Sequence, residues 1–128
     1  MTEPAVRVVL DASAIIAFTR GSIDVGEVIA EVADEENCVF GLPVLCVAEA
    51  ARVVADRDRL QLLVNHPIAE ILSPPPDSWE ALAVTLDTVG RVDAATAVLA
   101  AIDLGCSVLT GQPGLYGGIA GGGPVIPI

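Results

Sequence analysis

Three acidic residues, Asp11, Glu49 and Asp93, stand in apolar stretches where a carboxylate is costly to bury. Carboxylates in such surroundings repel one another unless a cation or hydrogen bonds compensate their charge. Mg²⁺ and Mn²⁺ supply that compensation, because these hard cations prefer carboxylate oxygens and retain waters for chemistry. If the three side chains converge, they form an acidic pocket suited to metal-assisted cleavage of a phosphodiester.

Each carboxylate also has a simpler explanation. Asp11 is placed to cap the helix that it precedes, and Ser13 could share that role. Asp93 could likewise cap a helix, where the positive helix amino terminus favours an acid. Glu49 could pair with Arg52 one helical turn further on, which is a weak surface contact. The three residues point to a metal site more strongly as a set than any one of them does alone.

The order of the expected elements decides whether these acids can meet. Val6–Leu10 is expected to be a buried parallel strand that stops on Asp11, at the carboxyl edge of a sheet, where ligands bind in open α/β proteins. Further strands are expected at Cys38–Gly41, Ala69–Leu72, Ser107–Thr110 and around 125–126, and helices at 13–19, 23–36, 43–54, 57–64, 78–89 and 93–104. This alternation predicts an α/β domain over residues 1–128, with three layers, α/β/α, around a central, mainly parallel sheet of four to five strands.

The charge balance limits the partners that the protein can attract. The formal net charge is −11, and all six basic residues are arginine. Such a surface repels polyphosphate, so broad electrostatic capture of nucleic acid is excluded. A nuclease whose metal ions invert the local field is still possible, and so is a partner with basic segments. The acidity could also serve solubility alone.

The sequence predicts a cytoplasmic protein without a membrane segment. Its longest purely apolar stretch, Ala97–Ile102, is too short to span a bilayer. The amino terminus has no basic region followed by an apolar core, so no signal peptide is expected. Cys38, Cys46 and Cys106 are an odd number without paired short spacing, and we expect them to be buried, reduced thiols.

Four segments together resemble the PIN domain family, and the compact length is similar to the VapC-type toxin ribonucleases of bacterial toxin–antitoxin pairs. The segments are Val8–Ala14, Leu42–Ala50, Val92–Ala95 and Gly105–Thr110, in the order expected for the family. The resemblance implies Mg²⁺ or Mn²⁺ dependence and endonucleolytic attack on an RNA substrate. It also implies a homodimer and neutralisation by a small antitoxin.

Carried over by position, the resemblance assigns Asp11, Glu49 and Asp93 as catalytic residues and metal ligands. Ser13 matches a polar residue beside the first acid. Thr110 and Gln112 would complete the outer shell. Here the chain departs from the family, because Gln112 stands where a fourth carboxylate is expected. An amide oxygen still coordinates a cation but brings no charge, so a second metal would be bound more weakly.

These observations lead to one main hypothesis and two rivals. The main hypothesis is a divalent-metal-dependent endoribonuclease, the toxin of a toxin–antitoxin pair, whose attacking water needs no histidine base. The first rival is a PIN-like fold that acts as a binding or regulatory module with little hydrolysis, which Gln112 and the acidity favour. The second is a metal-binding receiver-like domain. It is weaker, because such domains need a late lysine and the chain contains none.

Overall fold

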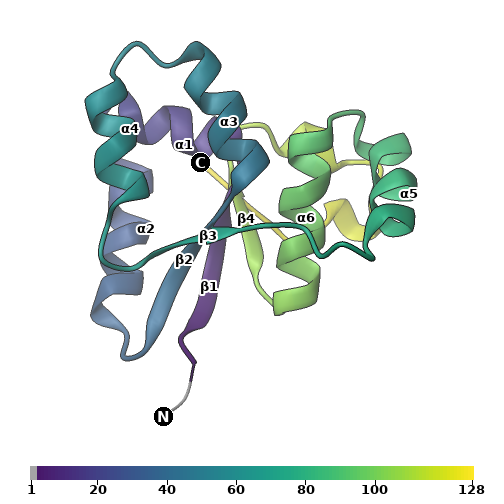
Figure 1. Cartoon of the computed structure of the whole chain (residues 1–128), viewed down its shortest axis with the longest axis horizontal. Helices are drawn as coiled ribbons and strands as arrows, with labels where there is room; N and C mark the ends of the chain where they lie inside the picture. The colour runs from purple at the N-terminus through teal and green to yellow at the C-terminus, as the bar shows by residue number, and fades with distance from the viewer. Residues whose placement is uncertain (1–2) are drawn as a thin grey trace.

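The computed structural model describes residues 3–128, which build one five-stranded sheet in the order β3-β2-β1-β4-β5. Every neighbouring pair of strands is parallel. The strands are β1 (Ala5–Leu10), β2 (Cys38–Pro43), β3 (Ala69–Leu72), β4 (Ser107–Thr110) and β5 (Val125–Pro127). Helices α1, α2 and α4 lie on one side of the sheet, and α5 and α6 lie on the other (Figure 1). The predicted three-layer α/β/α class with a parallel sheet is confirmed.

The helices lie close to the predicted positions. They are α1 (Ala12–Thr19), α2 (Ile23–Asp34), α3 (Val44–Val53), α4 (Arg57–Val64), α5 (Trp79–Val89) and α6 (Val92–Leu104). Two boundaries differ from the prediction by two residues, and the others differ by one residue at most. Helix α2 ends at Asp34 instead of Glu36, because Glu35 is already extended and Asn37 takes a positive φ of 56°. Strand β2 continues to Pro43 instead of Gly41, because Leu42 and Pro43 still pair with β3.

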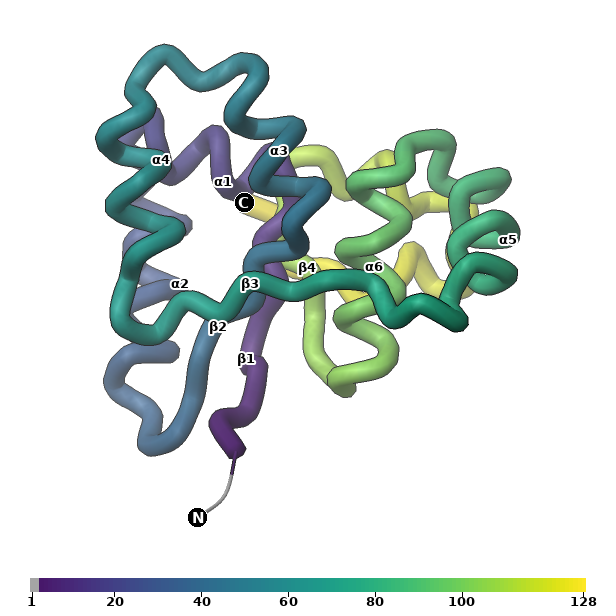
Figure 2. Tube along the Cα trace, viewed as in Figure 1, coloured from purple at the N-terminus to yellow at the C-terminus, as the bar shows by residue number. Residues whose placement is uncertain are grey.

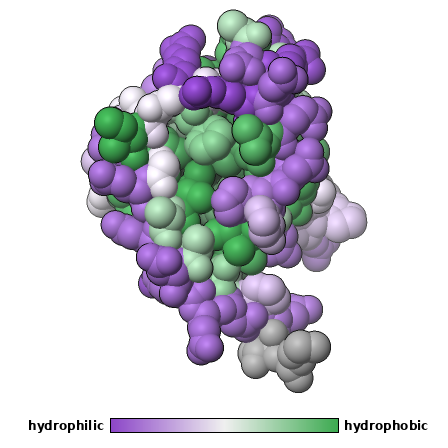
Figure 3. Space-filling model, turned by 90° about the vertical axis from the view of Figure 1, so that its left-hand side faces the viewer, coloured by the Kyte–Doolittle hydropathy of each residue, from purple (hydrophilic) through white to green (hydrophobic). Residues whose placement is uncertain are grey.

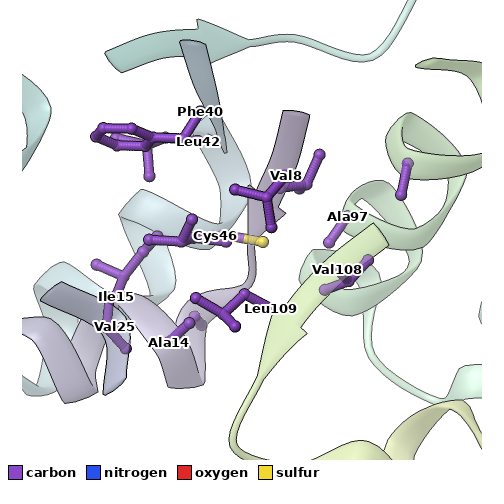
Figure 4. Packing of buried hydrophobic residues seen from close by; sticks show 14 of the residues in the cluster. Val8, Ala14, Ile15, Val25, Phe40, Leu42, Cys46, Ala97, Val108 and Leu109 are labelled. Atoms are coloured by element: carbon purple, nitrogen blue, oxygen red, sulfur yellow. The ribbon is translucent and has the colours of Figure 1, made fainter. Parts of the chain in front are cut away.

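The core lies where the central strands meet the helices. Val9 and Leu10 of β1 and Leu109 of β4 are fully buried, as expected for strands covered on both faces. Figure 4 shows these layers close up, with Val8, Phe40 and Leu109 extending from neighbouring strands toward the surrounding helices. Each large apolar side chain buried in this way contributes about 1.5–3 kcal/mol. The core therefore holds the carboxyl ends of β1 and β4 firmly in register.

Strand β2 has a glycine, Gly41, at its centre. A Cβ on Gly41 would lie 2.6 Å from Cδ1 of Leu72 and 3.2 Å from Cγ1 of Val6. The first separation is shorter than real Cβ contacts, but both atoms belong to side chains, so a larger residue would require the Leu72 side chain to turn aside. Gly41 thus leaves room for the Leu72 side chain against β2.

The glycine-rich tail is more ordered than the flexible turn that its composition suggests. It contains two 3₁₀ helices, η1 (Pro113–Tyr116) and η2 (Ala120–Gly122), before β5. Tyr116 is completely buried. The backbone N–H of Ile128 donates to the carbonyl of Thr110, and the trace shows the carboxyl terminus ending near α1 (Figure 2).

Two further expectations concern membranes and thiols. No helix within residues 3–128 is long and apolar enough to cross a bilayer. The three cysteines are free thiols, as predicted. The expectation that all three are buried is wrong, because only Cys46 is buried while Cys38 and Cys106 are half-buried. The latter two lie at the amino-terminal ends of β2 and β4, where the helices cover the strands less completely.

Candidate functional site

The predicted acids lie at the point where the chain changes direction across the sheet. From β1 the chain proceeds to β2 and β3 on one side, and then returns to β4 and β5 on the other. Leu10 pairs with Leu109, so Asp11 and Thr110 end adjacent strands. In open α/β sheets this switch point forms a crevice at the carboxyl ends of the strands. Asp11, Glu49 and Asp93 come together in this crevice.

Asp11 is anchored by three donors that carry no charge. Its Oδ1 accepts from the hydroxyl of Ser13 at 2.6 Å and from the backbone N–H of Ala14 at 3.1 Å. Its Oδ2 accepts from the phenol of Tyr116 at 2.7 Å. Only 2% of Asp11 is exposed. A carboxylate offers about four acceptor positions, so three of them are filled and the side chain is fixed in place.

Asp93 and Glu49 are held in a different way, by one arginine. The Nε of Arg91 lies 3.2 Å from Oδ1 of Asp93, and its Nη2 lies 3.3 Å from Oδ2. The same Nη2 is 3.4 Å from Oε1 of Glu49. Arg52 holds the other Glu49 oxygen, Oε2, at 2.7 Å from Nη1. Two carboxylates from different helices are thus bridged by one guanidinium.

The three predicted acids line one pocket of about 160 Å³. Asp11 reaches it from the end of β1, Glu49 from α3 and Asp93 from the first turn of α6. Helix α3 begins at the carboxyl end of β2, and α6 precedes β4 and so starts at the same edge. The sheet order places β2, β1 and β4 side by side, which explains why residues far apart in sequence share one pocket.

A divalent cation meets one obstacle in this pocket. Within residues 3–128, no three Asp, Glu, His or Cys side chains are arranged to hold a metal ion. The carboxylate oxygens already have partners in the protein. Asp11 accepts from neutral donors, and Arg91 bridges Glu49 and Asp93. The donors themselves, carboxylate oxygens with an amide at the rim, are those that Mg²⁺ and Mn²⁺ prefer. The donor set fits such a cation, provided that the guanidinium first moves away.

The predicted outer residues lie on the Asp11 side of the pocket. Ser13 lines it, and its hydroxyl also accepts from the backbone N–H of Gly111 at 2.8 Å. Thr110 is buried, with Oγ1 at 3.3 Å from Oγ of Ser13. Gln112 lines the rim, and its backbone N–H donates to Oγ1 of Thr110. Thr110 therefore reaches the acids through Ser13, while the Gln112 side chain borders the pocket directly.

Sequence reasoning missed two residues, Arg91 and Tyr116. The pKa of Arg91 is raised, first by its hydrogen bonds with Asp93 and by the charge of that carboxylate, and then by the charges of Glu49 and Asp11. The pKa of Tyr116 is raised far above its ordinary value by burial, and the charge of Asp11 adds to this. Arg91 therefore stays charged and Tyr116 stays protonated, so each keeps donating to its carboxylate.

The simpler explanations of the acids hold in part. Asp11 does cap α1, and Glu49 does pair with Arg52. Asp93 is not a cap, because α6 begins one residue earlier and Arg91 is its N-cap. The backbone carbonyl of Asp93 instead accepts from the thiol of Cys46 at 3.2 Å, and burial raises the pKa of that thiol. This contact joins α3 to α6 at Asp93, which lines the pocket.

Comparison with known proteins identifies the fold. No protein-family model matches the sequence, and no curated protein matches it. The structure is similar to the crystal structure of PAE2754 from Pyrobaculum aerophilum, with a TM-score of 0.63 and 18% sequence identity over 89% of this chain and 86% of that chain. At this identity the likeness establishes a shared fold alone. The chemistry of the pocket has to come from its own residues.

Proposed function

We propose that the protein is a divalent-metal-dependent endoribonuclease, the toxin of a toxin–antitoxin pair. One observation carries the proposal: Asp11, Glu49 and Asp93, from three separate elements, line a single pocket at the switch point of the sheet. Buried acids cost free energy unless their charge is used or compensated. Two buried acids and the half-buried Glu49 in one crevice at the ligand-binding edge support a cation-assisted reaction better than three unrelated structural roles.

Asp11 and Asp93 would hold Mg²⁺ or Mn²⁺, and Glu49 would add a ligand or orient the attacking water. A bound ion of this kind activates water for attack on a phosphodiester and stabilises the leaving oxygen. The protein contributes the positioning. Tyr116, Ser13 and the α1 backbone hold the Asp11 carboxylate in one orientation. No general-base histidine is needed, in keeping with the absence of His66 from the residues that line the pocket.

The remaining parts of this proposal concern partners and location. An RNA substrate, a cognate antitoxin, a homodimer and a cytoplasmic location follow from the resemblance of the sequence to VapC-type toxins. A net charge of −11 favours a partner with basic segments. Ile23 of α2 is 74% exposed and Leu62 of α4 is 67% exposed, and apolar side chains gather on the face that these helices form (Figure 3). Exposed apolar patches rimmed by polar residues support a protein interface.

Cleavage of a structured, 5′-labelled RNA by the pure protein with Mn²⁺ tests the proposal. We expect fragments with the wild type and none with Asp11→Asn, which removes the charge and keeps the shape of the side chain. Asp87→Asn is the matched control, since Asp87 is exposed on α5 and does not line the pocket. Circular dichroism confirms that each variant is folded. Absence of cleavage by folded wild type at all Mn²⁺ concentrations would reject the nuclease proposal.

A second candidate is a binding or regulatory module without hydrolysis. Two observations favour it: Arg91 already forms ion pairs with Glu49 and Asp93, and Gln112 brings no fourth charge to the rim. This candidate predicts that folded protein captures a basic protein partner but never cleaves RNA, with or without metal. The same wild-type assay therefore decides between the two candidates.

A further inference from the structure

The side chain of Arg91 bridges the two helices that supply two of the pocket's acids. Its fork contacts both oxygens of Asp93, and Nη2 also approaches Glu49. Arginine suits this task because its planar guanidinium presents several donors in a fixed geometry. Arg91 is also the single cationic side chain among the described residues that line the pocket. It is the positive charge that the acids of α3 and α6 share, in addition to Arg52 on Glu49.

The guanidinium is held on the open side of the pocket. Its side chain is 40% exposed, against 28% for Glu49 and 11% for Asp93. Ion pairs that water reaches are weak, so a guanidinium in this position can exchange its partners. Asp11 has no arginine contact and is held by neutral donors. A bound cation could therefore replace the guanidinium at Glu49 and Asp93, whereas Asp11 has no guanidinium to replace.

We propose that Arg91 is a built-in competitor of the divalent cation: its guanidinium occupies the Glu49–Asp93 pair, and a metal ion binds there only after Arg91 has moved away. The inference rests on the proposed function, which assigns these carboxylates to a cation. Arg91 then sets the metal concentration at which the site fills. A guanidinium and a divalent cation that contact the same carboxylates repel each other at short range, so the presence of one raises the free-energy cost of binding the other.

A purely structural arginine would behave differently. Arg91 is the N-cap of α6, and its contact with Asp93 two residues later also fixes the start of that helix. If that were its whole role, removing it would lower the unfolding temperature and leave metal affinity unchanged. Competition predicts the opposite for affinity, because removal frees both oxygens of Asp93 and Oε1 of Glu49, while Oε2 of Glu49 stays paired with Arg52. Metal affinity and unfolding temperature therefore separate the two roles.

Mn²⁺ titration followed by electron paramagnetic resonance, without RNA, measures the affinity directly. We expect Arg91→Gln to bind Mn²⁺ about tenfold more tightly than the wild type, or tighter still, because a cation within a few ångströms has been removed. Arg57→Gln makes the same change in net charge on exposed α4, away from the pocket, and should shift the affinity less than about twofold at moderate salt. Mn²⁺ should also raise the unfolding temperature of Arg91→Gln more than that of the wild type.

The outcomes separate this inference from the proposed function. Equal Mn²⁺ affinity of wild type and Arg91→Gln would overturn the competition and leave the nuclease proposal standing. No binding by either protein would overturn both. Should Arg91→Gln fail to fold, the wild type supplies a second measurement by nuclear magnetic resonance. Mg²⁺ should then shift the Nε–H signal of Arg91 toward that of a solvated arginine and leave the Arg7 signal in place, and an unchanged Arg91 signal would overturn the competition.

Discussion

Asp11 and Asp93 line the same pocket and are both buried, with 2% and 8% exposure, yet their charges are compensated by different chemistry. Asp11 is surrounded by a hydroxyl, a phenol and a backbone N–H, none of which carries charge. Asp93 is paired with a guanidinium that is partly open to water. Neutral donors fix a carboxylate without cancelling its charge, whereas an arginine cancels the charge and can be displaced. The Asp11 side is therefore the permanent half of the pocket, and the Asp93 side is the exchangeable half.

The largest expected effect comes from removing the carboxylate on the permanent half. Asp11→Ala leaves the phenol of Tyr116 buried without its acceptor and removes the cap of α1. We expect the free energy of unfolding to fall by about 3 kcal/mol. Glu49→Ala, at a side chain that is 28% exposed, should cost less than about 1 kcal/mol. Urea unfolding followed by far-ultraviolet circular dichroism measures both, and equal losses would contradict the distinction between the halves.

Tyr116→Phe removes one of the neutral donors and keeps the ring. The variant loses a hydrogen bond to a buried carboxylate, so the free energy of unfolding at neutral pH should fall by about 2 kcal/mol. Ser13→Ala serves as a comparison, because Ser13 is less buried and Asp11 Oδ1 keeps the N–H of Ala14. Its loss should be smaller. If Tyr116→Phe were as stable as the wild type, the phenol would not be what holds Asp11.

The raised pKa of Tyr116 gives this prediction a pH dependence of known sign. In the unfolded chain a tyrosine loses its proton near pH 10, whereas in the folded chain Tyr116 keeps it. The unfolded state therefore binds fewer protons above that pH, and the stability that Tyr116 provides falls as the pH rises. The advantage of the wild type over Tyr116→Phe should shrink above pH 10. Because the chain has one tyrosine, absorbance near 295 nm follows this group alone, and it should rise only as the protein unfolds.

The two halves also differ in what the sequence could reveal. Asp11 was predictable, because a charge that ends an apolar strand must lie at the carboxyl edge of the sheet. The apolar periodicity and the glycines after α5 and α6 likewise placed most helix and strand boundaries within two residues. These features are local, and local sequence determines them. The same reasoning placed Glu49 and Asp93 in helices, and their meeting with Asp11 stayed a condition of the hypothesis.

The donors that hold these acids were not predictable in the same way. Tyr116 lies 105 residues after Asp11, and it reaches that carboxylate from η1, which packs against β5 and α5. No periodicity in a glycine-rich tail signals such a contact. The sequence contained one weak indication of Arg91, because this arginine stands two residues before Asp93 at the start of a predicted helix. Its second contact, with Glu49 on α3, depends on the packing of two helices that are distant in sequence.

On the exchangeable half, Arg91→Gln should lower the free energy of unfolding by about 1–2 kcal/mol. A chelator in the sample removes divalent cations, so that only the effect of removing the arginine is measured. The loss arises because Asp93, only 11% exposed, is left without its donor. Arg52→Gln is the graded comparison. Its side chain is 71% exposed and pairs with the half-buried Glu49, so it should cost less than about 0.5 kcal/mol.

Salt should distinguish the halves as well. In about 1 M NaCl the effect of Arg91→Gln should shrink, because exposed ion pairs are screened. The effect of Tyr116→Phe should persist, since that hydrogen bond is buried. Thermal unfolding at low and high salt measures both variants. A salt-insensitive Arg91→Gln would mean that its ion pairs are as enclosed as the Asp11 contacts.

The smallest expected change in stability, within about 0.5 kcal/mol, comes from Gln112→Glu, which restores the missing fourth carboxylate at an exposed position. Its effect should appear in metal binding, with an Mn²⁺ affinity several-fold higher in calorimetry. Gln61→Glu is the matched control, because it makes the same chemical change on exposed α4. Gln112 is joined through Thr110 and Ser13 to the Asp11 side, where no arginine competes. A new carboxylate there adds charge that no guanidinium cancels, so equal affinities for the two variants would mean that the cation does not lie beside Asp11.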